Sequence, residues 1–167
     1  MSDHPLLRAD DILEALVEAK VAFVVIGGLA AQVHGSPSLT GDVDICHSLD
    51  RENLDRLASA LKNLDAVRRT MPAGVRAPLD AQALRAGDVF TLSTRAGDLD
   101  LLAHPDPGLD FATLVRGAST VAILGVPVRV AGIDDLMAMK RAAGRPKDRI
   151  ELEILGALRE EIDRRPE

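Results

Sequence analysis

The sequence is poor in aromatic residues and in cysteine. Its 167 residues include no tryptophan or tyrosine, three phenylalanines, and one cysteine, Cys46. Proteins that stack the bases of single-stranded nucleic acid need several exposed aromatic side chains, so the composition argues against that mode of binding. A single cysteine cannot form an intramolecular disulfide, which fits a reducing compartment.

Long apolar runs and an N-terminal signal pattern are also missing. No segment approaches the ~20 consecutive apolar residues that a membrane-spanning helix needs. Residues 1–4 are polar and lack the basic stretch with which a secretory signal begins. We therefore expect a cytoplasmic protein without a membrane partner.

The charge of the chain is negative overall but unevenly distributed. The net charge of −6 argues against a general nucleic-acid coat protein. Residues 66–149 nevertheless carry 12 basic and 9 acidic residues, which suits either a polyanion-binding face or scattered surface arginines. The length and an apolar content of 47% predict one domain over residues 1–167.

Hydrophobic periodicity predicts alternating helices and strands. Helices are expected at 10–20, 29–34, 50–64, 111–117, 133–143 and 146–163, and strands at 21–26, 43–46, 66–70, 89–94, 98–103, 120–124 and 126–130. Proline and glycine predict loops at 71–80 and 104–108 and hairpin turns at Gly97 and Gly125. We expect an α/β (α+β) fold with a mixed sheet and a C-terminal helical pair from about residue 132. In the last helix, the residues predicted to face inward are Ile150, Ile154, Leu155 and Leu158.

A glycine pair and an acid pair follow one another early in the chain. Gly27 and Gly28 end the first apolar strand, where glycine lets the backbone approach a phosphate closely. Asp42 and Asp44 follow at i and i+2 on a predicted strand, so both carboxylates lie on one face, roughly 7 Å apart along it. This oxygen-rich pair suits Mg²⁺ or Mn²⁺, although two solvated aspartates at a strand edge would need no ion. Thr40 caps the loop before the acids or touches phosphate, and we favour the cap.

A third acid is available on a later strand. Asp98 and Asp100 share one face of the segment that begins at Gly97. Asp100 leads into two leucines and is expected near the centre of the sheet, whereas Asp98 is expected in the turn. We favour Asp100 as the third metal ligand and as a general base, with Asp98 as the alternative. Three such acids suit a two-metal mechanism.

Basic residues gather where the last two helices meet. Lys140, Arg145 and Lys147 are expected to contact a triphosphate or an RNA backbone. Asp148 is expected to pair with one of them or to act in the first turn of the last helix. A charged helix connection with surface salt bridges is the alternative. Elsewhere, Cys46 is expected in the core, and the histidines are too scattered for a zinc site.

These motifs together resemble the nucleotidyltransferases of the DNA polymerase beta-like superfamily. Within that superfamily, residues 10–160 look most like small prokaryotic members of the abortive-infection toxin type. Their closing motif, a helix with a lysine followed by Arg-x-Lys-Asp, is similar to the stretch from Asp134 to Asp148. The resemblance implies phosphate binding by Gly27 and Gly28, metal binding by Asp42, Asp44 and Asp100, and nucleotide contact by Lys140. The chain departs from the pattern at Ser38, where the resemblance implies an arginine.

Two functions follow from these observations. The first is Mg²⁺-dependent transfer of an NMP group from an NTP to a hydroxyl of RNA, such as the 3′ end of tRNA, of a protein or of a small molecule. The resemblance also implies a toxin–antitoxin role with an antitoxin partner. The alternative is an inactive nucleotidyltransferase-like module that binds nucleotide or a partner. The missing arginine at Ser38 favours the alternative, and the three acids favour the enzyme.

Overall fold

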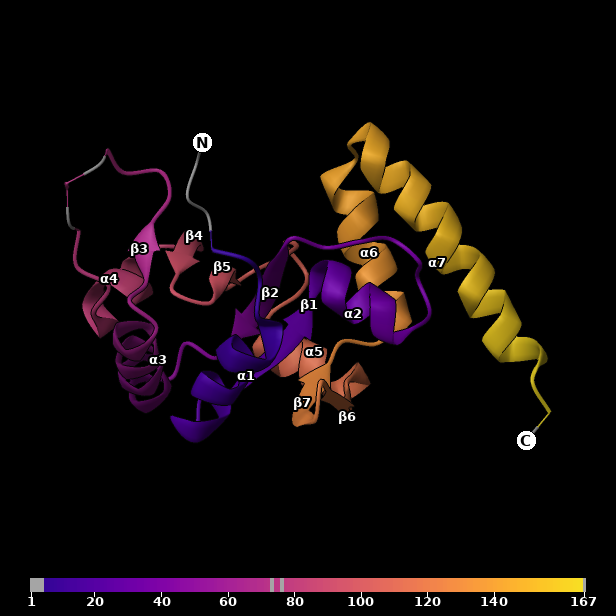
Figure 1. The fold of residues 1–167 in the computed structure, drawn as a ribbon. Coiled ribbons are helices and arrows are strands. Elements are labelled where there is room, and N and C mark those ends of the chain that lie inside the picture. The colour runs from indigo at the N-terminus through magenta and orange to yellow at the C-terminus, as the bar shows by residue number, and fades with distance from the viewer. Residues whose placement is uncertain (1–4, 73, 76, 167) are drawn as a thin grey trace.

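The computed structural model describes residues 5–72, 74, 75 and 77–166, through which runs a seven-stranded mixed sheet (Figure 1). The helices are α1 (Ala9–Glu18), α2 (Gly27–Val33), α3 (Arg51–Asn63), α4 (Ala81–Ala86), α5 (Phe111–Gly117), α6 (Ile133–Ala143) and α7 (Pro146–Arg164). The strands are β1 (Phe23–Ile26), β2 (Asp42–His47), β3 (Val67–Arg68), β4 (Val89–Thr94), β5 (Gly97–Leu102), β6 (Ser119–Ile123) and β7 (Val126–Val130). The polar N-terminal stretch 1–4 and two positions of the predicted loop at 71–80 lie outside the described residues.

The predicted fold class and order of elements are confirmed, with three local corrections. Helix α4 was not predicted because it is short and buries only Leu84; it begins where the Asp80 carboxylate accepts a hydrogen bond from the Ala83 N–H at 2.8 Å. Asp98 does not lie in the turn but inside β5, because the strand already begins at Gly97. Ile150 does not face inward: the residue is 62% exposed, whereas Leu155 of the same helix is fully buried.

The strand order β3-β4-β5-β2-β1-β7-β6 places β2 at the centre of the sheet. Strand β2 pairs antiparallel with β1 and parallel with β5. The register sets Asp42 opposite Asp98 and Asp44 opposite Asp100, and sets Ile26, the last residue of β1, opposite Asp44. Four acidic residues and the start of α2 therefore meet at one end of the central strands, where β2 and β5 begin and β1 ends.

Alternation along β2 separates the core from the acidic face. Val43 and Ile45 are fully buried on one face, while Asp42 and Asp44 point to the other and remain partly exposed. Helix α1 contacts α3 and strands β2, β5 and β7, and α2 contacts β1, β2 and α6. This packing leaves the polar face of β2 and β5 open next to α6.

Helices α6 and α7 form the predicted C-terminal pair beside α2 (Figure 1). Gly144 ends α6 with a φ of +65°, a left-handed conformation that glycine adopts without strain. Pro146 then begins α7, where its missing N–H and restricted φ suit the first turn of a helix. In the described part of the chain, no helix has the length and apolar character needed to cross a bilayer.

Candidate active site

Three carboxylates from two neighbouring strands converge on one point. Asp42 and Asp44 come from β2 and Asp100 from β5, and one oxygen of each lies within 4.8 Å of the others. The parallel register of β2 and β5 brings them together, because Asp44 and Asp100 are directly paired positions on the same face. Asp98 is not part of this group, although it lies opposite Asp42.

Burial and mutual repulsion make the acid group costly to ionise. Burial, followed by the charges of Asp42 and Asp100, raises the pKa of Asp44 from 3.8 to about 7. Burial also raises the pKa of Asp100, although a hydrogen bond and the charge of Arg69 oppose the shift. Carboxylate oxygens are the donors that Mg²⁺ and Mn²⁺ prefer, and an ion among them would relieve the repulsion. The residues present therefore fit a divalent cation.

The glycine pair lets α2 begin directly against the acids. Gly27 has a φ of +68°, and a Cβ there would overlap the Asp44 carboxylate. A Cβ on Gly28 would lie 2.9 Å from Thr40 Cβ and Oγ1. The Thr40 hydroxyl donates to the backbone oxygen of Asp42 at 3.0 Å, so Thr40 secures the loop at the first acid, as the favoured prediction required. Both glycines are thus needed for close packing.

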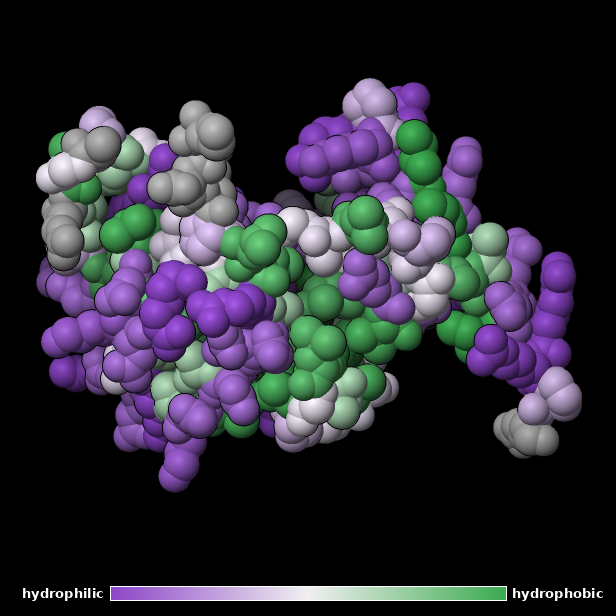
Figure 2. All heavy atoms as spheres, viewed as in Figure 1, coloured by the Kyte–Doolittle hydropathy of each residue, from purple (hydrophilic) through white to green (hydrophobic). Residues whose placement is uncertain are grey.

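A cavity of about 260 Å³ extends from the acids to the last two helices. Its polar lining consists of Gly27, Asp44, Asp100, Lys140, Arg145 and Asp148. Its apolar lining comes from β1, α2, β4, β5, α6, α7 and the loop after β5: Ile26, Ala31, Val89, Leu102, Pro105, Leu136, Met139, Ala143 and Leu155. Figure 2 shows the surface hollowed between the polar tip of α6–α7 and the body of the sheet.

Asp148 organises the basic residues at the end of this cavity. Its side chain is 1% exposed and lies 3.4 Å from Lys140 Nζ and 2.6 Å from Arg145 Nε. The Arg145 backbone N–H also donates to Asp148 at 3.1 Å, which caps the start of α7. The hydrogen bond from the Arg145 side chain is the main cause that lowers the pKa of Asp148 to about 2. The predicted pairing of Asp148 is thus confirmed.

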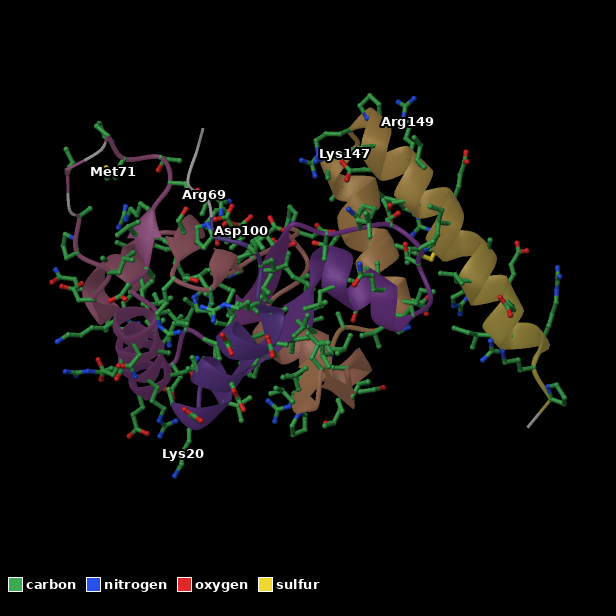
Figure 3. The ribbon with its side chains drawn as sticks, in the orientation of Figure 1. Lys20, Arg69, Met71, Asp100, Lys147 and Arg149 are labelled. Atoms are coloured by element: carbon green, nitrogen blue, oxygen red, sulfur yellow. The ribbon has the colours of Figure 1, made fainter. Side chains whose placement is uncertain are left out.

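Lys147 lies apart from the other two basic residues. It is exposed at the start of α7 and does not line the cavity. Figure 3 shows Lys147 and Arg149 at the tip of the α6–α7 pair, across the gap from Asp100. The structure therefore brings Lys140 and Arg145 to the cavity and leaves Lys147 outside its lining.

Arg69 is a site residue that sequence reasoning missed. Its Nη2 donates to Asp100 Oδ1 at 2.7 Å, and its Nη1 lies 3.4 Å from Asp98 Oδ2 (Figure 3). The only sequence signal was its place in the short strand predicted at 66–70, and this segment reaches the acids only because β3 and β4 pair next to β5. A local pattern does not contain that pairing.

The cysteine and the histidines lie outside the acid group. Cys46 is fully buried, and burial raises the pKa of its thiol to about 12, so the predicted core role is confirmed. His34 contacts the Ala131 carbonyl at 2.8 Å, and His104 contacts Asp88 at 2.8 Å. His47 is 1% exposed, and neither of its ring nitrogens has a hydrogen-bond partner among the residues that the structure describes.

Comparison with known proteins gives agreement in structure rather than in sequence. No protein-family profile and no curated protein match the chain. A Thermotoga maritima protein assigned to the nucleotidyltransferases superposes with a TM-score of 0.55 at 16% identity, over 99% of this chain and 100% of its own. The lincomycin-bound lincosamide adenylyltransferase LnuA superposes with a TM-score of 0.60 at 14% identity, over 92% and 99%. The chain has the nucleotidyltransferase fold.

A further similar structure is that of ANT(2″)-Ia in complex with adenylyl-2″-tobramycin. It superposes with a TM-score of 0.50 at 19% identity, over 92% of this chain and 95% of its own. These identities are low, so the comparisons establish the nucleotidyltransferase fold and leave the substrate of this chain open.

Within the nucleotidyltransferase fold, Ser38 has a structural role at the position where the sequence resemblance implied an arginine. The Ser38 hydroxyl donates to the Glu151 carboxylate of α7, and Gln32 Nε2 donates to the Ser38 carbonyl at 2.9 Å. The first bond fastens the loop between α2 and β2 to α7, and the second ties the same loop to α2. Lys140 and Arg145 remain as the cationic side chains that line the cavity.

Proposed function

We propose that this protein is a divalent-metal-dependent nucleotidyltransferase that transfers an NMP group from an NTP to an acceptor hydroxyl. The observation that carries the proposal is the convergence of Asp42, Asp44 and Asp100 beside a cavity that Asp44 and Asp100 line together with Lys140 and Arg145. The nucleotidyltransferase fold of the chain supports the same reading.

In this proposal the nucleotide occupies the cavity with its phosphates toward the acids. Gly27 presents its backbone beside Asp44, and Gly28 follows it beside Thr40. Lys140 and Arg145 supply positive charge for the phosphates. Lys147, exposed at the start of α7, meets the phosphates or an incoming acceptor. The apolar side chains of α6 and β5 would contact the nucleoside, and no aromatic residue lines the cavity in the described part of the chain.

The proposed reaction breaks a phosphoanhydride bond of the NTP and forms a phosphoester bond to the acceptor. The acceptor oxygen attacks the α-phosphorus, the bond between the α- and β-phosphates breaks, and pyrophosphate leaves with the bonding electron pair. Asp100 takes the proton of the acceptor hydroxyl, and Lys140 stabilises the charge that grows on the pyrophosphate. A divalent ion held by Asp42, Asp44 and Asp100 would supply charge neutralisation at the transferred phosphate.

The test is turnover with each class of acceptor. The protein is incubated with α-labelled NTPs and Mg²⁺ or Mn²⁺, together with total RNA, a protein extract, or small hydroxyl-bearing molecules that include an aminoglycoside and a lincosamide. We expect label on one class of acceptor. Asp42→Ala and Asp44→Ala should lower the rate at least ~100-fold, because each removes an acid of the proposed metal site. Asp55→Asn, on the exposed face of α3, is the matched control and should leave the rate unchanged.

The alternative function is binding of nucleotide without turnover. The bond from Ser38 to Glu151 favours it, because the position of the implied arginine is used to hold the loop. Absence of transfer with every NTP and acceptor, together with saturable NTP binding, would support this alternative over the enzyme. The toxin–antitoxin role and an antitoxin partner remain predictions from the sequence resemblance.

A further inference from the structure

Arg69 is held at the acid group by contacts from three sides. Its backbone N–H donates to the Thr91 carbonyl at 2.9 Å, and Nη1 donates to the Leu92 carbonyl at 2.8 Å. Its guanidinium lies against Asp98 and Asp100, and the side chain is 24% exposed. A guanidinium fixed by backbone and carboxylates loses little further freedom when it orients a partner.

The two acids of β5 make different contacts around this arginine. Asp98 accepts from the Ser93 hydroxyl at 3.2 Å and lies beside Arg69 Nη1 at 3.4 Å, outside the group of three acids. Asp100 belongs to that group and receives the shorter bond from Arg69, at 2.7 Å on Oδ1. A carboxylate has two oxygens, so a bond through Oδ1 leaves Oδ2 available. Asp98 thus anchors the arginine, and the arginine holds Asp100.

We propose that Arg69 is the positioning residue of the acid group, a resident counter-charge that holds Asp100 in place before a divalent ion binds. The inference rests on the proposed function. Three carboxylates within 4.8 Å repel one another, and a fixed guanidinium at Asp100 offsets part of that repulsion in the metal-free protein. The same positive charge opposes the approach of a cation. Arg69 therefore lowers the affinity of the site for metal while it keeps Asp100 in position.

These two effects predict changes in Mn²⁺ affinity and in kcat that the loss of a purely structural arginine would not produce. We expect Arg69→Gln to bind Mn²⁺ alone, measured by electron paramagnetic resonance without nucleotide, about tenfold more tightly than the wild type because a neighbouring positive charge is lost. We expect kcat for transfer to fall at least ~10-fold with little change in KM for NTP, because Asp100 is no longer held. Arg69→Lys keeps the charge, so its Mn²⁺ affinity should stay within about threefold of the wild type while kcat falls.

Thermal unfolding supplies a readout that needs no activity. Metal-free Arg69→Gln should melt several degrees below the wild type, and saturating Mn²⁺ should recover most of that loss, because the ion replaces the missing charge. The matched control is Arg68→Gln, whose guanidinium lies 5.0 Å from the centre of the Phe90 ring on the opposite face of β3; Mn²⁺ should not recover its loss.

Unchanged or weaker Mn²⁺ binding in Arg69→Gln would overturn the inference, as would a melting loss that Mn²⁺ leaves in place. If Arg69→Gln does not fold, Arg69→Lys decides: wild-type kcat in that variant also overturns the inference. Failure of the proposed function is a separate outcome. It would appear as absence of transfer in the wild type, while Mn²⁺ binding and melting would still test Arg69.

Discussion

Gly27 and Asp44 lie so close together that a methyl group on the glycine would overlap the carboxylate. The contact arises because β1 and β2 are antiparallel and Ile26 is paired with Asp44, so the residue after Ile26 turns directly across the acid. The φ of +68° at Gly27 makes this turn possible and begins α2 there. A glycine is therefore required after β1 because a side chain there would occupy the space of the Asp44 carboxylate.

A Gly27→Ala substitution should disable the site. We expect it to lower transfer at least ~100-fold and to weaken Mn²⁺ binding, because the new methyl group displaces Asp44. The matched control is Gly125→Ala in the β6–β7 hairpin, where φ is +84° but no described residue lies within 4 Å of a Cβ. Both variants should lose about 1 kcal/mol of stability from backbone strain. Equal activity in the two variants would contradict the packing argument.

The acid group should make the metal-free protein less stable as the pH rises. The pKa of Asp44 is about 7 in the folded protein against 3.8 for an ordinary aspartate, so its neutral form is favoured by folding. This stabilisation is complete below pH 4 and is lost by about pH 7. In urea unfolding with EDTA, the free energy of unfolding of the wild type should therefore fall between pH 4 and pH 8. The difference in this free energy between Asp44→Asn and the wild type should shift by about 2–4 kcal/mol in favour of the variant over the same range. Parallel pH profiles for the two proteins would rule out this role of Asp44.

His47 should have the opposite effect on the pH dependence of stability. Burial lowers its pKa from 6.5 to about 4, so the folded state favours the neutral ring. The stabilisation of the folded state by the neutral His47 ring is complete above pH 6.5 and is lost as the pH falls to about 4. Replacement by leucine leaves no unpaired ring nitrogen, so His47→Leu should be within about 1 kcal/mol of its parent at pH 8 and about 2 kcal/mol more stable at pH 4.5.

The histidine test is best made in the Asp44→Asn background, which removes the opposing dependence of the acid. Urea unfolding at each pH gives the free energy of unfolding for the parent and for His47→Leu. A constant difference between pH 4.5 and pH 8 would show that the His47 ring is not kept neutral by the fold.

Asp148 should stabilise the junction of α6 and α7. Its carboxylate is buried, caps α7 through the Arg145 N–H, and pairs with Lys140 and with the Arg145 side chain. Because both basic partners can still reach water, we expect Asp148→Ala to cost about 2 kcal/mol rather than the full cost of breaking a buried ion pair. Chemical unfolding measures this, and Glu161→Gln, which loses only an exposed pair with Arg165, should change stability by less than about 0.5 kcal/mol. Similar losses in both variants would contradict the assigned role.

Much of the fold could be predicted because its signals are local. The predicted helix at 111–117 coincides with α5 and that at 133–143 with α6, since apolar spacing and an N-cap or a terminal glycine lie within each segment. Helix α4 was missed because six residues with one buried side chain leave no clear period. Ile150 was placed wrongly because spacing describes a helical face and does not say whether anything packs against it.

The residues of the candidate site were predicted from patterns that lie within short segments of the chain. Asp42 and Asp44 share a face through strand alternation alone, and Asp100 was favoured from the leucines that follow it. The position of Asp98 was wrong, because the pairing of Thr94 with Gly97 extends the hairpin strands further than the turn residues indicated.

By itself the sequence determined the order of the elements, the acid pair on β2 and the glycines before it, because strand and helix periods and glycine conformations act over a few residues. Tertiary structure alone decided that Asp100 joins the acid pair, that Arg69 holds it, and that α6 closes a cavity beside it. Each of these depends on the register between strands that are distant in the chain or on the packing of a helix more than a hundred residues from Gly27. Such contacts are set by how the whole core fits together, which no local pattern encodes.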